Sequence, residues 1–587
     1  MIAGALFGWG TLLSRLLRID VRSESSGWQR LWLGFAAIIL ILQIWNLAWA
    51  IDFRATVLVY GGGHAIFFIQ VCKSPRRCLV WFEKKRHCIY LFILLVAACW
   101  IASRAMLAPD NFDSGLYHFN SIRWLNEYPI VPGLGNLHGR LAFNQSFFAF
   151  VASLNLYPFS GHGHNFANSM LLLMLFSEAL YFLVIRLRRI APGESAGGVV
   201  EILPILFIPF LLYTAFRTSL SSPSPDTASL VLQIVLFLNF FRLVESRIQG
   251  DPVLSLTKVI LILATAMVTI KLSNLCFAGL ISIISFSMGY RKSPGMGSWL
   301  IKNMVVTVAF AALMLTVWMG RGVVLSGYPC YPATFMGFHT DWAVPQAKAQ
   351  AEANWISSWA RQPETDWRQV LGNWNWFQPW LRRIMNRQLD VVYPLALSLF
   401  FMFLFGVRVI RSAIRHRRVS AFWIISFVPI AAGLVFWFVL APHPRFAHAL
   451  FWITPIALAA MLLAGIESRR ARKAMSAFIS ILVVGPFLFW FYSNLHEWKR
   501  VSLVGWMPTP HVEMTEKVTL SGLKLFVPRE GKQSWDSPLP TTPNFNPQLC
   551  LRGSGLAAGF LIRPRAKVLP PSNSVAHRAD KRSKQFP

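Results

Sequence analysis

The chain has 587 residues, of which 55% are hydrophobic and only 14% are charged. Soluble globular proteins average about 25% charged residues, so this composition excludes an ordinary water-soluble enzyme and a disordered chain. The net charge of +31 is compatible with nucleic-acid binding, but the apolar excess instead indicates a membrane protein with basic cytoplasmic loops. We therefore expect membrane lipids, and no nucleic acid, as partners.

Thirteen apolar stretches approach the roughly 20 residues that a helix needs to cross a bilayer. The second contains Gly61, Gly62, Gly63 and His64, so we leave open whether it spans or re-enters. The first follows a polar N-terminal stretch and lacks a signal-peptide cleavage site, so its helix is expected to be retained. We predict an all-α polytopic integral membrane protein with about 13 transmembrane helices, near 31–51, 56–72, 88–107, 165–187, 199–217, 227–246, 255–271, 273–290, 299–318, 390–410, 420–440, 446–466 and 474–493.

The distribution of Lys and Arg predicts the orientation. Basic clusters follow the second, fourth, sixth, eighth, tenth and twelfth stretches, whereas the short connections on the other side hold only Arg54, Arg217 and Arg445. Short cytoplasmic loops carry the excess of positive charge. The N-terminus is therefore expected inside, and the segment after about residue 494 outside.

Long segments on the outer side divide the chain. We expect membrane helices in 1–107, 165–318 and 390–493, outer loops in 108–164 and 319–389, a small outer segment in 494–562 and a basic disordered tail in 563–587. The apolar piece 147–159 is too short to span and is expected along the outer surface. Cys330 and Cys550 are the only cysteines in these segments, and an outer compartment would permit a disulfide between them. We favour two free thiols, because nothing in the sequence fixes their distance.

The loop 319–389 mixes aromatic rings with cations. It contains seven tryptophans after residue 340, and Arg361, Arg368, Arg382 and Arg383 lie among them. One interpretation is an amphipathic helix at the membrane interface. Another is a platform on which Trp stacks against a sugar and Arg binds phosphate. The two interpretations are compatible.

Two carboxylates lie where the third stretch leaves the membrane, in Pro109-Asp110-Asn111-Phe112-Asp113. One or both could cap a helix that starts after Pro109. The alternative is a general base or a metal ligand, with a divalent metal ion as a possible cofactor. An acid at the membrane edge is costly unless it has a partner or a task, which favours a catalytic role for Asp113 or Asp110.

Further polar residues follow in the same loop. His118 comes soon after Asp113, and the run Gly133–Arg140 contains Asn136, His138 and Arg140. A lone histidine is more often structural than functional. Because these residues cluster near two carboxylates, we treat His118, His138 and Arg140 as candidate substrate-binding residues.

Three charged residues stand at other outer connections. Asp226 opens the sixth stretch and could cap its helix. Lys271 ends the seventh stretch and could simply extend to the interface. Arg445 is the single cation before the twelfth stretch and could bind lipid headgroups or a substrate phosphate. We predict that Asp110, Asp113, Asp226, Lys271 and Arg445 converge on one outer cavity, because their depths are similar.

An acidic residue where an early span exits resembles the GT-C superfamily of polytopic glycosyltransferases. Asp226, Ile270-Lys271 and Arg445-Phe446 resemble further positions of that superfamily, in the same order along the chain. Several segments of residues 100–560 are closest to an uncharacterised bacterial GT-C-like membrane family, including Asp113–His118, Gly133–Arg140, Gly327–Pro332 and Trp535–Pro540. Two features differ from the usual pattern, since two spans precede the acidic exit and the Glu-Lys-Pro-Pro motif of one branch is absent.

The resemblance implies a bacterial inner-membrane enzyme that uses a polyprenyl-phosphate-linked sugar on the periplasmic face, in cell-envelope glycan assembly. Asp113 or Asp110 would be the general base, and Lys271 and Arg445 would neutralise the leaving phosphate. An O-antigen-type polymerase or ligase is the alternative. Proteins of that kind also have a large periplasmic loop late in the chain, and the loop 319–389, which is rich in Arg and Trp, fits this pattern. A transporter comes last, since no inverted halves are recognisable. The sugar, the acceptor and the oligomeric state are not fixed by the sequence.

Overall fold

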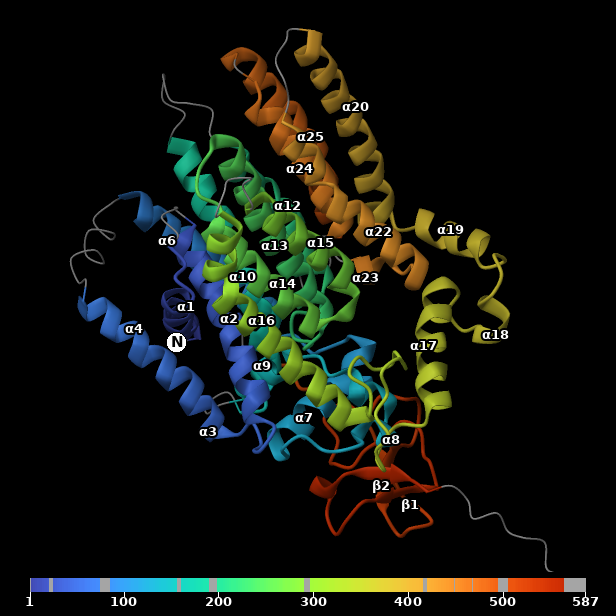
Figure 1. Ribbon diagram of the computed structural model, residues 1–587. Helices are drawn as coiled ribbons and strands as arrows, with labels where there is room; N and C mark the ends of the chain where they lie inside the picture. Colours follow the sequence, from blue (N-terminus) through green and yellow to red (C-terminus); the bar gives the residue numbers. More distant parts are fainter. Residues whose placement is uncertain are drawn as a thin grey trace, which may run out of the picture.

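The computed structural model describes residues 2–20, 25–73, 85–155, 160–188, 198–289, 296–414, 420–447, 449–466, 468–494 and 505–563. The chain forms a bundle of long helices with two small sheets near the C-terminal end (Figure 1). The tail predicted to be disordered lies outside the described residues, apart from Arg563. The prediction of an all-α polytopic protein is therefore confirmed for the membrane part.

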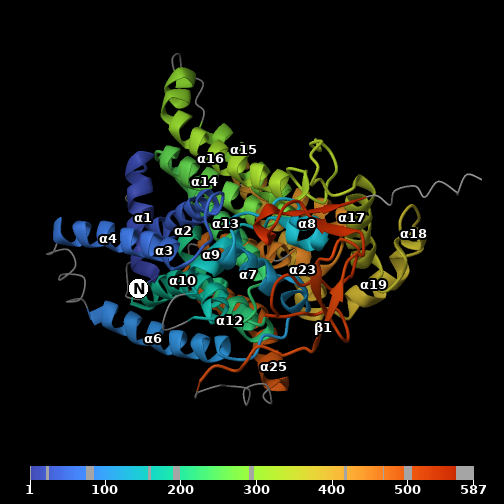
Figure 2. The same cartoon turned by 90° about the horizontal axis from the view of Figure 1, so that it is seen from below.

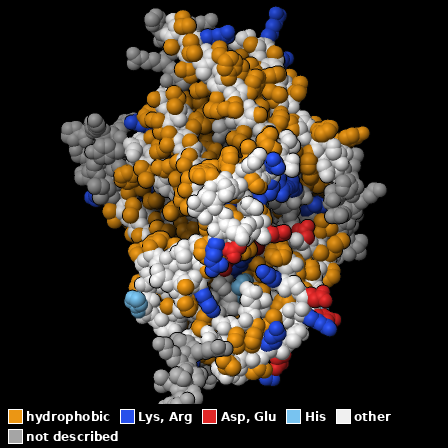
Figure 3. All heavy atoms as spheres, turned by 90° about the vertical axis from the view of Figure 1, so that its right-hand side faces the viewer, with side chains coloured by type: hydrophobic (Ala, Val, Ile, Leu, Met, Phe, Trp, Pro, Cys, Tyr) orange, Lys and Arg blue, Asp and Glu red, His pale blue; other side chains and the backbone are white. Residues whose placement is uncertain are grey.

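Eleven of the described helical segments are long and apolar enough to cross a membrane. They include α2 (Ser26–Trp45), α3–η1–α4 (Phe53–Thr56, Val57–Gly61, Gly62–Lys73), α6 (Lys85–Ala105), α10 (Gly163–Arg188), α11–α12 (Val199–Leu206, Ile208–Arg217), α13 (Pro225–Gln249), η4–α15 (Leu272–Asn274, Leu275–Gly289), α16 (Met296–Ser326), η5–α20 (Gln388–Val392, Tyr393–Ile414), α21–α22 (Ala421–Ile425, Val428–Leu440) and α25 (Arg469–Ser493). The weak second stretch is among them. Figure 3 shows hydrophobic side chains over much of the upper part of one face, whereas charged side chains gather in its lower half.

Three shorter apolar helices accompany these segments. Two of them, α14 (Leu254–Ile270) and α24 (Leu450–Ala464), coincide with predicted spans. The total of thirteen spans stays a prediction. At the centre of the bundle lies α13, which packs against α10, α11, α14 and α15. Helices therefore surround α13 on all sides. Its N-terminal end lies at the candidate site.

The third short helix, α1 (Ile2–Leu16), corrects the expectation of a polar N-terminal stretch. It packs against α2 and α4, and it is seen nearly end-on in Figure 1. Glycines permit this packing, because a Cβ atom on Gly8 would lie 1.9 Å from the carbonyl oxygen of Gly63. The glycines of the second stretch therefore serve close helix contact rather than a re-entrant turn.

The first outer loop folds into short helical pieces: η2 (Ser114–His118), α7 (Phe119–Glu127), α8 (Leu134–Leu137), η3 (Gly139–Phe143) and α9 (Phe147–Ser153). In the stretch 147–159, which the sequence places along the outer membrane surface, α9 covers seven residues and is too short to span. All seven of its residues are buried, because it packs against α2, α7 and α10. Its apolar composition reflects burial inside the protein and not contact with lipid.

The second outer loop forms α17 (Gln346–Arg361), α18 (Trp367–Val370) and α19 (Phe377–Met385). Its polar side chains hold the connection between α22 and the short helix α23 (Pro444–Ala447). Arg361 donates to the carbonyl oxygens of Leu440 and Val439 at 3.0 and 2.6 Å, and Trp380 Nε1 donates to that of Pro442 at 2.6 Å. This loop therefore fixes the backbone that carries Arg445.

Strands near the C-terminal end depart from the all-α expectation. Strand β1 (Met514–Val518) pairs antiparallel with β2 (Lys524–Pro528), and β3 (Leu549–Leu551) pairs antiparallel with β4 (Phe560–Ile562), while the 3-10 turn η7 (Leu556–Ala558) precedes β4. These strands lie at the same end of the bundle as α7, α8 and α17 (Figures 1 and 2). Cys330 and Cys550 are both free thiols.

The C-terminal unit, residues 505–563, closes onto the first outer loop. The amides of Ser534 and Trp535 both donate to the carbonyl oxygen of Gly115, at 2.8 and 2.9 Å. A Cβ atom on Gly115 would lie 2.6 Å from the Trp535 ring, so only glycine allows this approach. The unit thereby fixes the helical turn that follows Asp113.

We predict that Gly8→Ala lowers the thermal stability of the purified protein, because the added methyl group would overlap the Gly63 carbonyl and separate α1 from α4. Overpacking of this kind costs about 1–3 kcal/mol. Gly320→Ala is the matched control, since nothing lies within 4 Å of a Cβ atom at that helical position. Equal melting temperatures for the two variants would contradict the packing described for α1.

Candidate functional site

Asp113 lies at the start of η2, a short π-helical turn just beyond the outer end of α6. Its amide donates to Oδ1 of Asn111 at 3.0 Å, but its own carboxylate caps no helix. The side chain is 10% exposed and is directed away from the backbone toward two arginines. The capping interpretation is therefore wrong for Asp113.

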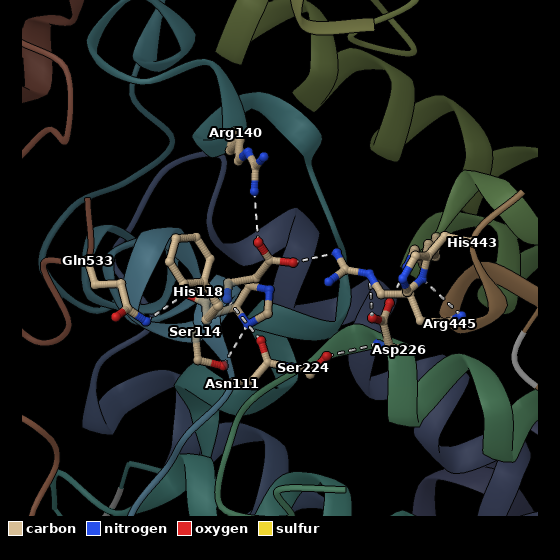
Figure 4. A network of polar contacts seen from close by, with 12 residues as sticks. Asn111, Ser114, His118, Arg140, Ser224, Asp226, His443, Arg445 and Gln533 are labelled. Atoms are coloured by element: carbon tan, nitrogen blue, oxygen red, sulfur yellow. Dashed lines mark hydrogen bonds and ion pairs between the residues drawn. The ribbon is translucent and has the colours of Figure 1, made fainter. Parts of the chain in front are cut away.

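Arg140 and Arg445 bind the Asp113 carboxylate at different oxygens. Arg140 Nη1 donates to Oδ1 at 2.8 Å, and Arg445 Nη2 donates to Oδ2. Figure 4 shows the two arginines approaching from different sides. Burial alone would raise the pKa of Asp113, but the charges of Arg445 and Arg140 outweigh it and hold the pKa below its usual value. Asp113 is therefore ionised.

Asp226 and Lys271 extend this network. Lys271 Nζ donates to Oδ1 of Asp226, and Arg445 Nε lies 3.7 Å from Oδ2 of the same carboxylate. Ser224 is the cap of α13, since its hydroxyl accepts from the amide of Asp226 at 3.3 Å. The expectation that Asp226 itself caps this helix is wrong, because its carboxylate binds the two cations instead.

The pKa values of Lys271 and Arg445 shift in opposite directions. Burial lowers the pKa of Lys271, and the nearby Asp226 carboxylate only partly opposes this effect. Burial would also lower the pKa of Arg445, but Asp113 and Asp226 raise it above its ordinary value. Arg445 is therefore the firmly charged member that joins both carboxylates.

Asp110 does not join the network. It is exposed, and its amide lies 3.4 Å from the hydroxyl oxygen of Ser219. Four of the five residues predicted to converge therefore meet, and Asp110 stays outside. The difference between Asp110 and Asp113 follows from the turn at Asn111, which directs only the second carboxylate inward.

A large cavity of about 1140 Å³ adjoins the network. Arg140 belongs to both, since it lines the cavity and binds Asp113. Aromatic rings form one wall, where Arg140 lies 4.7 Å from the ring centroid of Trp355 and Arg445 lies 5.2 Å from that of Trp359. The C-terminal unit contributes Lys532, Asn544, Phe545 and Asn546 to the opposite part of the lining.

The two candidate histidines occupy different positions. His118 is buried and its Nδ1 lies 2.9 Å from the Ser114 hydroxyl, whereas His138 lines the cavity. Burial lowers the pKa of each to about 3, so both rings are neutral at ordinary pH. His118 therefore supports the turn after Asp113, and His138 faces the cavity.

Sequence reasoning missed Glu352. It lies on α17, lines the cavity, and places Oε1 3.4 Å from Nε of Arg140. The signal was helical spacing, because the cavity-lining residues Lys348, Glu352, Trp355 and Trp359 recur at intervals of three or four. The tryptophans predicted a possible sugar-binding surface, but Glu352, the single acid on the same helical face, was not recognised as a candidate.

The arrangement does not suit a divalent metal ion. No group of three or more His, Cys, Asp or Glu side chains with metal-binding geometry occurs within the described ranges. The carboxylates of Asp113 and Asp226 are already engaged by cationic side chains. These residues therefore form a salt-bridge network and not a metal centre.

Comparison with known proteins places the chain in a family. A family model described as "Domain of unknown function (DUF8201)" matches residues 1–452. The chain belongs to the DUF8201 family. No curated protein and no solved structure shows significant similarity to this DUF8201 protein. The DUF8201 match includes all members of the network, whereas the C-terminal unit lies beyond it.

We predict that Asp113→Asn destabilises the DUF8201 protein, because it leaves two neighbouring guanidinium groups without their shared countercharge. Breaking a buried ion pair costs about 3–5 kcal/mol, and the partial exposure of Arg445 favours the lower end. Thermal unfolding of the purified variant measures the effect. Asp110→Asn is the control and should change stability by less than about 0.5 kcal/mol. A larger loss of stability in Asp110→Asn than in Asp113→Asn would contradict the central position of Asp113 in the network.

Proposed function

We propose that the protein is a membrane glycosyltransferase that takes a sugar from a polyprenyl-phosphate donor at the outer face of a bacterial inner membrane. The observation that carries this proposal is the cluster of Arg445 and Lys271 with Asp113 and Asp226 beside a large, aromatic-walled cavity. The resemblance of these same residues to the GT-C superfamily supports it. The product would belong to cell-envelope glycan assembly or modification.

The cations supply what a phosphate leaving group needs. When the bond between the sugar and the phosphate breaks, negative charge grows on the phosphate, and fixed cations stabilise that charge. Arg445 remains 35% exposed, so part of its side chain is open to a ligand. Lys271 stands on the other side of Asp226.

Asp113 acts in this proposal as a positioning residue. Both of its oxygens accept hydrogen bonds from arginines, and its pKa lies below the usual value. A carboxylate in that state takes up a proton poorly at neutral pH. Its task is to hold Arg140 and Arg445 at fixed positions, and the role of general base falls to another group.

The arginines of the second outer loop fit the polymerase alternative less well. Arg361 donates to backbone carbonyls of the last two residues of α22, and Arg383 donates to the carbonyl of Ala360 at 2.8 Å. These side chains support the protein's own backbone. The cations of the network are thus better placed than those of the loop to bind a substrate phosphate.

The proposal requires the network to face outward. The positive-inside distribution of charge predicts thirteen spans, a cytoplasmic N-terminus and a periplasmic C-terminus. A reporter that is active only in the periplasm, fused after residue 563, should therefore give a signal. A fusion that is active only in the cytoplasm would invert the topology and exclude a periplasmic donor site, because the C-terminal unit packs directly on the turn after Asp113.

Arg445→Gln should weaken binding of polyprenyl monophosphate to the purified protein in nanodiscs by about 10-fold or more, since a hydrogen bond to a charged group contributes about 1.5–3 kcal/mol. Arg382→Gln, at an exposed position on α19, is the control and should bind as the wild type does. Cells that lack the protein should also accumulate a polyprenyl-phosphate-linked sugar. Absence of accumulation together with unchanged binding by the Arg445 variant would refute the proposed function.

A further inference from the structure

One face of α17 forms a wall of the cavity and carries a single carboxylate. Lys348, Glu352, Trp355 and Trp359 all line the cavity from this face. The rings of Trp355 and Trp359 are nearly parallel, with an interplanar angle of 19° and centroids 6.4 Å apart. The face therefore combines stacked aromatic surface with one acid, which is the composition of many carbohydrate-binding surfaces.

Glu352 differs from Asp113 in how its charge is held. Its cationic neighbour is Arg140, with Oε1 3.4 Å from Nε, and Oε1 is buried without a hydrogen bond in the described part of the chain. Asp113 instead has a hydrogen bond at each oxygen. The Glu352 carboxylate thus retains acceptor capacity, and its residue belongs to the cavity lining. Burial raises its pKa, and the charge of Arg140 offsets this only in part.

The other walls offer further unused hydrogen-bonding atoms. Oδ1 of Asn136 and Nδ2 of Asn546 are both buried and make no hydrogen bond among the described residues. Both residues line the cavity, together with Tyr331 and Phe545. A ligand that both donates and accepts hydrogen bonds and presents flat apolar faces would satisfy them. Sugars have these properties, because hydroxyl groups donate and accept while the ring C–H groups stack on aromatic rings.

The size of the cavity indicates how large a ligand it can hold. Typical small-molecule pockets measure roughly 300–1,000 Å³, and this cavity, at about 1140 Å³, exceeds them. A single sugar would leave most of it empty. Its lining also joins two parts of the chain, since α17 forms one wall and the C-terminal unit another. The cavity therefore suits an oligosaccharide or glycan end that enters between them.

We propose that this cavity binds a carbohydrate acceptor and that Glu352 is the general base that deprotonates its attacking hydroxyl. The inference rests on the proposed function. The acceptor oxygen forms a bond to the anomeric carbon of the donor sugar, the bond from that carbon to the phosphate oxygen breaks, and the polyprenyl phosphate leaves with the electron pair. The hydroxyl proton passes to Glu352 and then to solvent. Arg140 joins Glu352 to Asp113, so the base lies beside the phosphate-binding cations.

The experiment uses membranes of a strain that lacks the native protein and carries wild type, Glu352→Gln, Glu352→Asp or Glu530→Gln. Donor synthesis is stopped, and the decay of the polyprenyl-linked sugar is followed by mass spectrometry. Glu530 is the control, because it is an exposed acid of the C-terminal unit that does not line the cavity. Binding of polyprenyl monophosphate to each purified variant is measured in parallel.

Glu352→Gln should slow donor decay by about 10²–10⁴-fold, the usual contribution of a general base, while polyprenyl monophosphate binding stays within twofold of wild type. Glu352→Asp keeps the charge beside Arg140 but retracts the carboxylate, so it should fold normally and still slow decay at least tenfold. Glu530→Gln should behave as wild type.

The results separate this inference from the proposed function. Wild-type decay rates in both Glu352 variants, with decay lost in the Arg445 variant, would overturn the role of Glu352 and leave the proposed function intact. Normal decay in Glu352→Asp alone would assign Glu352 a purely electrostatic role and also overturn it. If the strain without the protein accumulates no lipid-linked sugar, the proposed function fails and this inference fails with it.

Discussion

The sharing of Asp113 between Arg140 and Arg445 is the interaction on which the outer half of the molecule depends. These arginines lie 27 and 332 residues from Asp113, so one carboxylate joins the first outer loop to the helices near the other end of the sequence. Three like charges, those of the two arginines and Lys271, stand close together. They are tolerable at the membrane edge only because Asp113 and Asp226 neutralise them.

Other parts of the fold keep this network in place. The second outer loop holds the connection that carries Arg445 through Arg361 and Trp380. The C-terminal unit fixes the turn after Asp113 through two hydrogen bonds to Gly115. Three segments that are distant in sequence therefore meet at one site, and each contributes backbone contacts that set the position of a charged side chain.

Depth in the membrane made part of the site predictable. The sequence predicts Asp113, Asp226, Lys271 and Arg445 near outer ends of membrane helices, and a charge at that depth needs a partner. The sequence favoured Asp113 over Asp110 only narrowly, because the position of each carboxylate depends on the geometry of one turn. Glu352 was overlooked because it sits in a loop whose composition suggested an interfacial helix, and only the fold brings α17 beside Arg140.

The membrane helices were predictable for a similar reason, since long apolar stretches have few alternatives. Short segments were harder to predict. The helix Phe147–Ser153 is apolar but buried within protein, and Ile2–Leu16 depends on glycine contacts with α4 that no periodicity reveals. The strands after residue 513 are three to five residues long, and each is stabilised by a partner strand or by packing on the first loop rather than by its own sequence pattern.

The most direct test of this account is a cryo-electron microscopy structure of the full chain in nanodiscs with polyprenyl monophosphate. The account predicts phosphate density within hydrogen-bonding distance of Arg445 and Lys271, with Arg140 still bound to Asp113 and the large cavity open beside it. Phosphate bound only at the opposite membrane face, or an intact network with no density next to Arg445, would contradict it.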